Sequence, residues 1–188
     1  MLLTQKGTPF IYYGEEIGMV DGKIKRSQIQ DPLGKKYWPF HKGRDKARTP
    51  MQWDMTPNAG FSNGKPWLPV NSDYVTTNVL QQQRNKQSIL HLYKDSIAIR
   101  RLHPALYAGD IEFVSAPDDV LLYKRVFKNE HLMIALNFSK AKKDVTIGVK
   151  GEVLLSSCGN SSMHSSHSSI HGGTLTLDAY EAVIIKVQ

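Results

Sequence analysis

The stretch GTPFIYYGEEIGM occupies residues 7–19, and its first half is patterned as a strand. Residues 8–13 are apolar on both faces instead of alternating, which is typical of a parallel strand buried on both sides. Pro9 is compatible with a strand because it lies near the beginning. We therefore expect a strand over 8–13 that belongs to a parallel sheet, although the next hundred residues offer it no obvious partner.

The composition is that of an ordinary globular protein, with 40% hydrophobic and 22% charged residues. No apolar run approaches the roughly 20 residues of a membrane-spanning helix. The opening MLLTQKGTPF has too short an apolar part for a signal peptide and no basic residue before it. The single cysteine, Cys158, excludes an internal disulfide framework and fits a reducing compartment. We expect a cytoplasmic protein without a membrane partner.

The net charge of +7 raises the question of a nucleic-acid partner. The basic residues are dispersed in short groups, such as KIKR at 23–26 and KAKK at 140–143, and acids and aromatics interrupt them. A nucleic-acid footprint normally gathers basic residues on one face or stripe. The pattern therefore favours a solvated basic surface and no nucleic-acid partner.

Residues 21–85 contain most of the nine prolines and all three tryptophans, Trp38, Trp53 and Trp67, without clear periodicity. So long an irregular stretch is unusual inside a compact domain and is usually functional. The aromatic residues argue against disorder. We expect a packed, irregular excursion with short helical turns.

Residues 86–102, KQSILHLYKDSIAIRRL, are the clearest helix, with an apolar stripe at helical spacing. Ser88 can cap its beginning, and the His-Pro pair at 103–104 ends it. The stripe consists of Ile89, Leu92, Tyr93 and Ile97.

From residue 107 the period changes to short β-rich runs parted by turn residues, at the spacing of an all-β sandwich. We place the connection near residues 105–109. Residues 1–106 cannot close a core of their own, because one two-sided strand and one helix leave apolar surface uncovered. They are expected to be the end of a larger α/β domain. The β-rich runs are DIEFVSA, VLLYKRVF, HLMIALNFS, KDVTIGV, EVLLSS, GTLTLDA and EAVIIKVQ.

Several motifs in a fixed order, spread over essentially the whole chain, carry a family resemblance. DPLGKKYWPFHKGRDKARTPMQWD is the most specific, and it follows GTPFIYYGEEIGM and precedes NAGFS, PWLPVN and NVLQQQ. This series resembles the α-glucosidases of the α-amylase superfamily of glycoside hydrolases. It looks most like bacterial maltase, oligo-1,6-glucosidase and related sucrose- or trehalose-active enzymes.

The resemblance implies an α/β plus all-β architecture, in which a (β/α)₈ barrel is followed by an antiparallel β-sandwich. Residues 8–13 would be the eighth strand and 88–102 the eighth helix. Residues 14–85 would be the loop between them, on the face where barrels carry their active sites. The expected domains are 1–106, the C-terminal fragment of the catalytic barrel, and 107–188, the sandwich.

The resemblance also implies retaining hydrolysis, which needs two carboxyl groups about 5 Å apart. In that family these groups and a third carboxylate lie on earlier barrel strands, whose motifs are absent here. We therefore expect the C-terminal portion of a retaining α-glucosidase, inactive without the N-terminal barrel portion. Its substrates would be small α-glucosides of the maltose, isomaltose, sucrose or trehalose type, and no cofactor, metal or catalytic residue is expected in this chain.

The acidic residues of this chain have more ordinary interpretations than a new catalytic pair. Glu15 and Glu16 are adjacent, so their side chains should diverge. The other candidates should cap helices, make turns or pair with neighbouring arginines. They are Asp31, Asp45 and Asp54, with Arg44 and Arg48 as the basic partners.

Arg48 is the preferred substrate-binding residue, because the resemblance points its motif arginine inward and a guanidinium offers a planar fork of donors. A structural salt bridge, for example with Asp45, is the alternative. Arg44 and Asp45 are candidates for the pocket wall or its support, and the structural role is favoured for them. Tyr13 is a candidate for the pocket wall, with packing an equal alternative.

The three tryptophans could stack on sugar rings, but large aromatics more often hold a loop down. We expect core positions for Trp53 and Trp67 and leave Trp38 open. Gln52 should bond loop backbone.

Residues 156–173, SSCGNSSMHSSHSSIHGG, form a Ser/His-rich segment. A polar hairpin loop is favoured over a metal site, because the spacing is not a standard zinc pattern.

A second functional class stays open beside the enzyme. A non-catalytic homologue on the same scaffold, either transporter-associated or a sugar-binding module, would share most of these features. The intact GRDKARTPMQWD favours the enzyme, because a decayed scaffold need not keep an inward-facing arginine.

Overall fold

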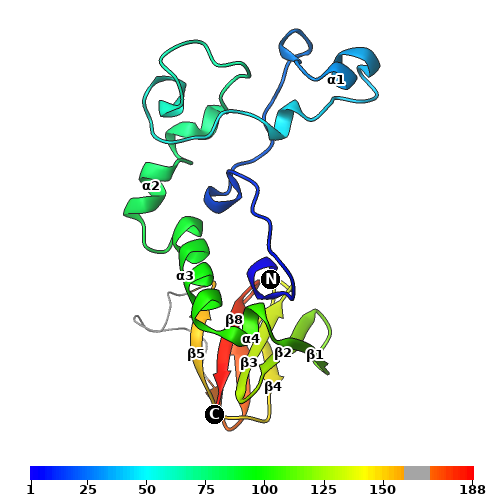
Figure 1. The fold of residues 1–188 in the computed structure, drawn as a ribbon, viewed down its shortest axis with the longest axis vertical. Helices are drawn as coiled ribbons and strands as arrows, with labels where there is room; N and C mark the ends of the chain where they lie inside the picture. Colours follow the sequence, from blue (N-terminus) through cyan, green and yellow to red (C-terminus); the bar gives the residue numbers. More distant parts are fainter. Residues whose placement is uncertain (159–169) are drawn as a thin grey trace. The chain divides into compact units, whose positions relative to one another are not determined.

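The computed structural model describes residues 1–158 and 170–188, and the described chain divides into two compact units (Figure 1). The sheet unit comprises Met1–Phe10 and Leu92–Gln188. The loop unit comprises Ile11–His91. The Ser/His-rich segment lies mostly outside the described residues.

These units do not follow the expected boundary between residues 106 and 107. That boundary concerns the domains of a larger protein and stays a prediction.

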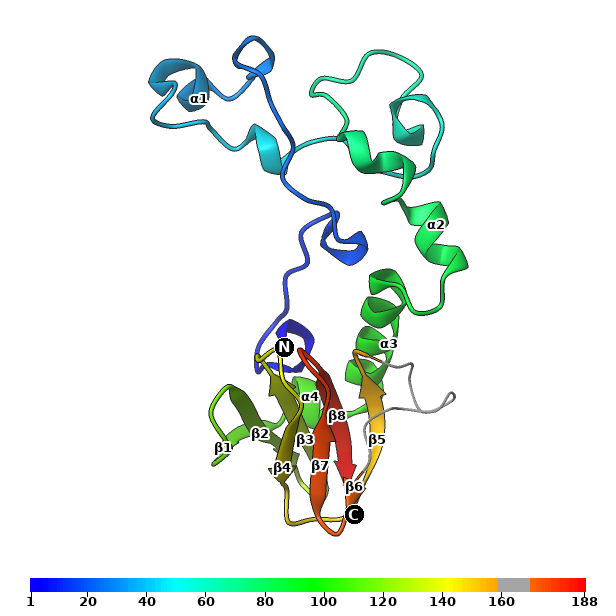
Figure 2. The same ribbon diagram turned by 180° about the vertical axis from the view of Figure 1, so that it is seen from behind.

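The sheet unit contains two antiparallel sheets, one of five strands in the order β1-β2-β3-β8-β5 and one of three in the order β4-β7-β6 (Figure 2). The larger sheet consists of β1 (Asp110–Val114), β2 (Val120–Phe127), β3 (Glu130–Asn137), β8 (Ala182–Val187) and β5 (Gly151–Ser156). The smaller sheet consists of β4 (Lys143–Thr146), β7 (Thr174–Leu177) and β6 (Ile170–His171). Each β-rich run of the sequence contains one of these strands, and only β6 was not predicted.

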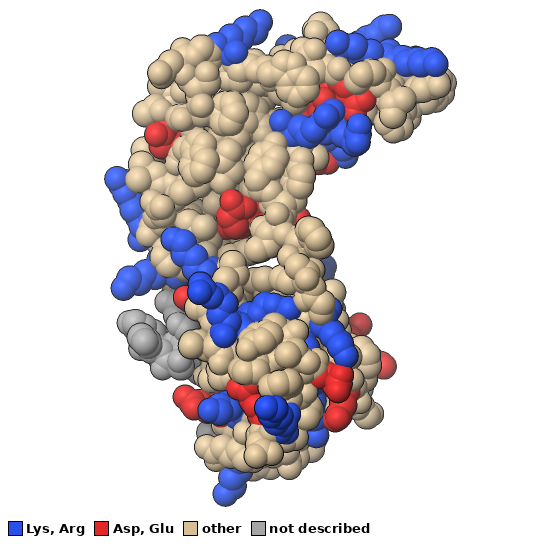
Figure 3. Space-filling model, in the orientation of Figure 1, with Lys and Arg blue, Asp and Glu red and all other residues tan. Residues whose placement is uncertain are grey.

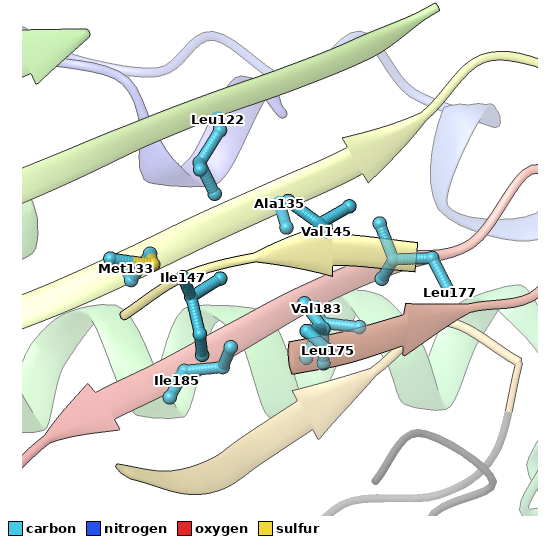
Figure 4. Close-up of a cluster of buried hydrophobic side chains, with 9 residues drawn as sticks. All are labelled: Leu122, Met133, Ala135, Val145, Ile147, Leu175, Leu177, Val183 and Ile185. Atoms are coloured by element: carbon cyan, nitrogen blue, oxygen red, sulfur yellow. The ribbon is translucent and has the colours of Figure 1, made fainter. Parts of the chain in front are cut away.

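The two sheets pack against one another around an apolar cluster (Figure 4). Period-2 alternation assigns the side chains: on β2, Leu122 points into this cluster and Tyr123 to the opposite face. On β3, Met133 and Ile134 divide in the same way. The two antiparallel sheets are consistent with the predicted antiparallel sandwich. The cluster between the sheets consists of Leu122, Met133, Ala135, Val145, Ile147, Leu175, Leu177, Val183 and Ile185.

The other face of the large sheet is covered by helices instead of water. Helix α3 (Ile89–Leu102) confirms the predicted amphipathic helix, and the hydroxyl of Ser88 accepts a hydrogen bond from the backbone of His91 in its first turn. The expected connection near residues 105–109 holds α4 (Pro104–Tyr107), whose Ala105 and Leu106 are fully buried. These two side chains form part of the second apolar cluster.

Residues 8–13 do not form a strand, which corrects the sequence-based prediction. The residues before them form a short 3₁₀ helix, η1 (Leu2–Thr4). A strand requires a neighbour for its backbone N–H and C=O groups. The described part of the chain provides none, and the side chain of Phe10 is 84% exposed.

Two buried arginines tie the first residues to the sheet unit. Arg125 on β2 is fully buried and donates hydrogen bonds to the carbonyl oxygens of Thr4 and Leu106 at 2.5 and 2.9 Å. Arg100 on α3 donates to the carbonyls of Leu3, Gln5 and Gly7 at 2.9, 3.0 and 2.6 Å. These contacts account for the place of Met1–Phe10 in the sheet unit.

The loop unit is the predicted irregular excursion with short helical turns. Its small core is formed by Ile17, Met51 and Leu90. Its elements are η2 (Glu15–Ile17), η3 (Arg26–Gln28), α1 (Pro32–Tyr37), η4 (Asp45–Ala47), η5 (Pro57–Gly60), η6 (Ser72–Val75) and α2 (Val79–Arg84).

No helix among the described residues is long and apolar enough to cross a membrane. On the face drawn in Figure 3, lysine and arginine side chains form several separate groups instead of one patch. This distribution agrees with the dispersed charge of the sequence.

Candidate functional site

The site is organised by two buried carboxylates of the loop unit, the first of which is Asp31. It caps α1, since its Oδ1 atom accepts a hydrogen bond from the backbone N–H of Leu33 at 2.9 Å. Its Oδ2 atom accepts from the backbone N–H of Arg44 at 3.0 Å. Gly43 lies between, with a φ of +73°, and a Cβ atom there would come within 2.8 Å of the Asp31 side chain. Glycine is therefore required for this close approach.

The second carboxylate, Asp45, begins the 3₁₀ turn η4 and is fully buried. Its Oδ2 atom accepts hydrogen bonds from the backbone N–H groups of Gln30 and Asp31, at 2.6 and 2.9 Å. Both carboxylates are thus fixed by main-chain donors from neighbouring segments.

Arg48 donates hydrogen bonds to one oxygen of each carboxylate. Its Nη2 atom lies 3.1 Å from Asp31 Oδ2 and 2.8 Å from Asp45 Oδ1. The Cζ atom lies 6.0 Å from the ring centroid of Trp67, within cation–π range. Its Nε atom is buried and has no hydrogen-bond partner among the described residues.

The hydrogen bonds to Asp31 stabilise the ionised form of its carboxyl group. The backbone N–H of Arg44, with the N–H groups of the α1 cap, lowers the pKa of Asp31 from 3.8 to about 2. Asp31 is therefore ionised at any physiological pH. Arg44 itself adds a longer contact of 3.4 Å from a side chain that is 75% exposed.

A pocket of about 410 Å³ opens beside Arg48 within the loop unit. Its wall includes four aromatic side chains, and Glu16 is the only carboxylate that lines it among the described residues. Flat apolar rings around one guanidinium suit a ligand that combines an apolar face with hydroxyl groups. The side chains that matter here are Tyr13, Glu16, Arg48, Trp53, Phe61 and Trp67.

Tyr13 stands in this wall and is fixed by its hydroxyl, which donates to the carbonyl oxygen of Thr49 at 2.8 Å. Its ring lies 4.9 Å from that of Tyr12. Burial, followed by the neighbouring Tyr12, raises the pKa of Tyr13, so the hydroxyl stays protonated and keeps this hydrogen bond.

The sequence-predicted residues occupy different places around the pocket. Arg48 and Tyr13 line it. Arg44 and Asp45 do not line it, and Asp45 instead supports Arg48 from behind. Asp31 caps α1, and Asp31 and Asp45 both form ion pairs with Arg48, as expected for structural carboxylates. Asp54 makes a turn, in which it accepts a hydrogen bond from the backbone N–H of Thr56.

The core positions expected for Trp53 and Trp67 were wrong, because their side chains are 49% and 64% exposed. Both rings face the pocket instead of the interior of the loop unit. Gln52 does bond loop backbone, through the carbonyl of Thr77.

Sequence reasoning missed the pocket roles of Glu16 and Phe61. Glu16 accepts a hydrogen bond from the backbone N–H of Gly14, a contact that no residue pattern indicates.

Comparison with known proteins assigns the chain to a family. The family model described as alpha amylase, catalytic domain, matches residues 1–109, which is more than half of the sequence and includes the whole pocket wall. The chain belongs to the alpha-amylase family. This is a family of glycoside hydrolases, in agreement with the resemblance seen in the motifs.

Individual relatives agree with the family assignment. A probable alpha-glucosidase of Rhizobium meliloti is 38% identical over 74% of this chain and 25% of the relative. A glucan 1,6-alpha-glucosidase of Streptococcus pneumoniae is 35% identical over 82% of this chain and 32% of the relative. Among solved structures, the trehalulose synthase MutB from Pseudomonas mesoacidophila matches with a TM-score of 0.81 and 30% identity, over 100% of this chain and 37% of that protein.

The chain therefore spans about a quarter to a third of the length of the curated relatives it matches. These alpha-amylase family neighbours carry a barrel-plus-sandwich fold, with which the antiparallel sheets of the sheet unit are consistent.

No group of three or more metal-ligating side chains is present within residues 1–158 and 170–188. The histidine-rich part of the Ser/His-rich segment falls outside this range or has no described side chain, so its polar-loop interpretation stays a prediction.

Proposed function

We propose that this chain forms the C-terminal part of a retaining α-glucosidase that acts on small α-glucosides of the maltose, isomaltose, sucrose or trehalose type. The observation that carries the proposal is Arg48, held by two buried carboxylates in the wall of an aromatic pocket. The glucosidase names of the family relatives support the substrate class.

Residues 8–13 form no strand in this chain by itself. In this proposal they become the eighth strand of a (β/α)₈ barrel when the preceding part of the barrel is present, and residues 88–102 are its last helix. The domains are then 1–106 and 107–188. The exposure of the apolar residue Phe10 supports a barrel partner, because an apolar segment of this kind requires neighbouring strands. That partner is the N-terminal barrel portion of the same protein.

The substrate contacts are proposed from the pocket wall. Arg48 donates hydrogen bonds to sugar hydroxyls, and Tyr13 forms part of the wall. Arg44 and Asp45 contribute by fixing the loop that carries Arg48.

Catalysis requires groups beyond this chain. Retaining hydrolysis needs two carboxyl groups about 5 Å apart, and Glu16 is the single carboxylate that lines the pocket within the described residues. We therefore propose that residues 1–188 alone are inactive. We also propose that the whole enzyme works in the cytoplasm without a cofactor.

The test is a chimaera that joins the preceding part of the Rhizobium meliloti relative to residues 1–188 of this chain. We expect the folded chimaera to hydrolyse an aryl α-glucoside, and residues 1–188 alone to show no turnover. Arg48→Ala in the chimaera should lower kcat/KM by about 10- to 100-fold, because a charged hydrogen bond contributes about 1.5–3 kcal/mol.

Arg26→Ala is the matched control, since Arg26 is an exposed arginine of the same loop unit that does not line the pocket. Hydrolysis by residues 1–188 alone would contradict the inactivity. A folded chimaera that binds sugar without hydrolysing it would favour the non-catalytic homologue, and Arg48→Ala kinetics equal to those of the Arg26→Ala control would remove Arg48 from the site.

A further inference from the structure

The arginine in the pocket wall is held from one side only. Both carboxylates contact the same nitrogen of Arg48, Nη2, and neither Asp31 nor Asp45 lines the pocket. The guanidinium is therefore anchored at one corner, from behind the wall. The Nε–H group has no acceptor among the described residues.

The anchor cannot easily rotate away. Asp45 receives two main-chain N–H donors in addition to Arg48, and Asp31 receives those of Leu33 and Arg44. Carboxylates fixed in this way define both the position and the plane of the guanidinium they bind. A ring face of Trp67 limits its motion further.

The anchor also determines the charge that a ligand meets. Asp31 and Asp45 are buried, whereas the side chain of Arg44 is 75% exposed and its charge is largely screened by water. Two buried negative charges thus face the one positive charge of Arg48, and Glu16 adds a further carboxylate to the wall. An anion that approached Arg48 would find no net positive potential.

We propose that Asp31 and Asp45 are positioning residues for Arg48: they anchor one nitrogen of its guanidinium and cancel its charge, so that the accessible part of the guanidinium serves a neutral hydroxyl and the pocket rejects anions. Only the naming of that hydroxyl as a sugar hydroxyl rests on the proposed function. The anchoring and the exclusion of anions concern this chain alone.

The experiment uses ¹⁵N-labelled residues 1–188 and the NMR signal of the Arg48 Nε–H group, identified by its loss in Arg48→Lys. Inorganic phosphate is the probe, added at constant ionic strength. Asp31→Asn is the main variant, because asparagine caps a helix as well as aspartate does and α1 is retained. Asp45→Asn is the second variant, and conservation of the amide spectrum verifies the fold of each.

In the unsubstituted chain we expect a slowly exchanging Nε–H signal that phosphate does not move. In Asp31→Asn and Asp45→Asn the signal should exchange faster and respond to phosphate with an apparent Kd at least about tenfold lower. Asp21→Asn is the matched control, since its exposed pair with Lys46, at 2.6 Å, lies outside the pocket wall. This control should behave as the unsubstituted chain does.

Three results would each overturn the proposal: phosphate moving the signal equally in the unsubstituted chain and in the variants, no gain of phosphate binding in Asp31→Asn and Asp45→Asn, or no protected Nε–H signal at all. Loss of hydrolysis in the chimaera would contradict the proposed function and leave this measurement unaffected, so the two failures are distinguishable.

Discussion

Arg100 and Arg125 donate hydrogen bonds to the same acceptor, the carbonyl oxygen of Leu106, at 2.8 and 2.9 Å. Two buried guanidinium groups therefore lie side by side, with main-chain carbonyl oxygens as their hydrogen-bond acceptors. Burial lowers the pKa of both, and for Arg125 the neighbouring Arg100 lowers it further. Such an arrangement is stable only when the carbonyl groups satisfy the donors, so the pair depends on the first residues of the chain.

The first prediction concerns Arg125→Met. This change removes the Arg125 donor from the carbonyl groups of Thr4 and Gly109 and leaves that of Leu106 with Arg100 alone, so we expect a loss of about 3–5 kcal/mol in the free energy of unfolding of the sheet unit. Amide hydrogen exchange of Met1–Phe10 should become fast at the same time. Urea unfolding and exchange mass spectrometry measure the two effects.

Lys6→Ala is the control for this prediction. It removes an ion pair of 2.7 Å with Asp110, which joins the first residues to β1, but both side chains are mostly exposed. The expected loss is at most about 1 kcal/mol. Equal effects of Arg125→Met and Lys6→Ala would contradict the role of the buried pair.

The second prediction concerns the cluster between the two sheets. Leu175 is fully buried there, so Leu175→Ala should lower the free energy of unfolding by about 2–5 kcal/mol through lost burial and a cavity. Phe138→Ala removes a larger side chain that is 57% exposed, and we expect about 1 kcal/mol or less. Urea unfolding of both variants checks the order, and a larger effect of Phe138→Ala would place the core elsewhere.

The third prediction is a dependence of stability on pH. The pKa of Asp31 is lowered from 3.8 to about 2 in the folded chain, chiefly by the backbone N–H of Arg44. Its contribution is therefore fully present above pH 3.8 and is lost as the pH falls toward 2. Asp31→Asn should flatten the decline in the unfolding free energy of the loop unit between about pH 5 and about pH 2.

Urea titrations at a series of pH values measure this slope. Asp21→Asn serves as the control, because that carboxylate is half exposed and pairs with Lys46 at the surface. A decline that is equally steep in Asp31→Asn and in the unsubstituted chain would show that Asp31 is not held by these donors.

Local patterns predicted the parts of the fold that depend on near neighbours. β-rich runs bounded by turn residues were sufficient for β2 and β3, because each strand has its partner a few residues away. The stripe of α3 was sufficient for the same reason. The segment 8–13 has the pattern of a strand, but a pattern does not provide a partner, and the segment stays extended and exposed.

Contacts between residues far apart in the chain could not be predicted from the sequence. In the sequence VLLYKRVF, Arg125 follows Lys124 and has the pattern of a surface basic residue. In the structure it is fully buried, and it donates hydrogen bonds to carbonyl oxygens that include that of the distant Thr4. In the loop unit, ion pairing of Asp31 with Arg44 and Arg48 was predictable from charge and proximity. The exposure of Trp67 was not, since its ring has an open pocket beside it and aromatic residues are usually buried.

The fourth prediction follows from that exposed ring. Trp67→Ala in the chimaera removes the cation–π contact with Arg48, which contributes about 0.5–2 kcal/mol, so kcat/KM for an aryl α-glucoside should fall by about 2- to 30-fold. Trp67→Phe keeps a ring that binds a cation more weakly, so its kcat/KM should lie between those of the unsubstituted chimaera and Trp67→Ala. Phe40→Ala is the control, since that side chain is 97% exposed and does not line the pocket. Because Trp67 is itself 64% exposed, thermal unfolding should change little, and a large loss of stability in Trp67→Ala would mean that the ring holds the loop instead of the arginine.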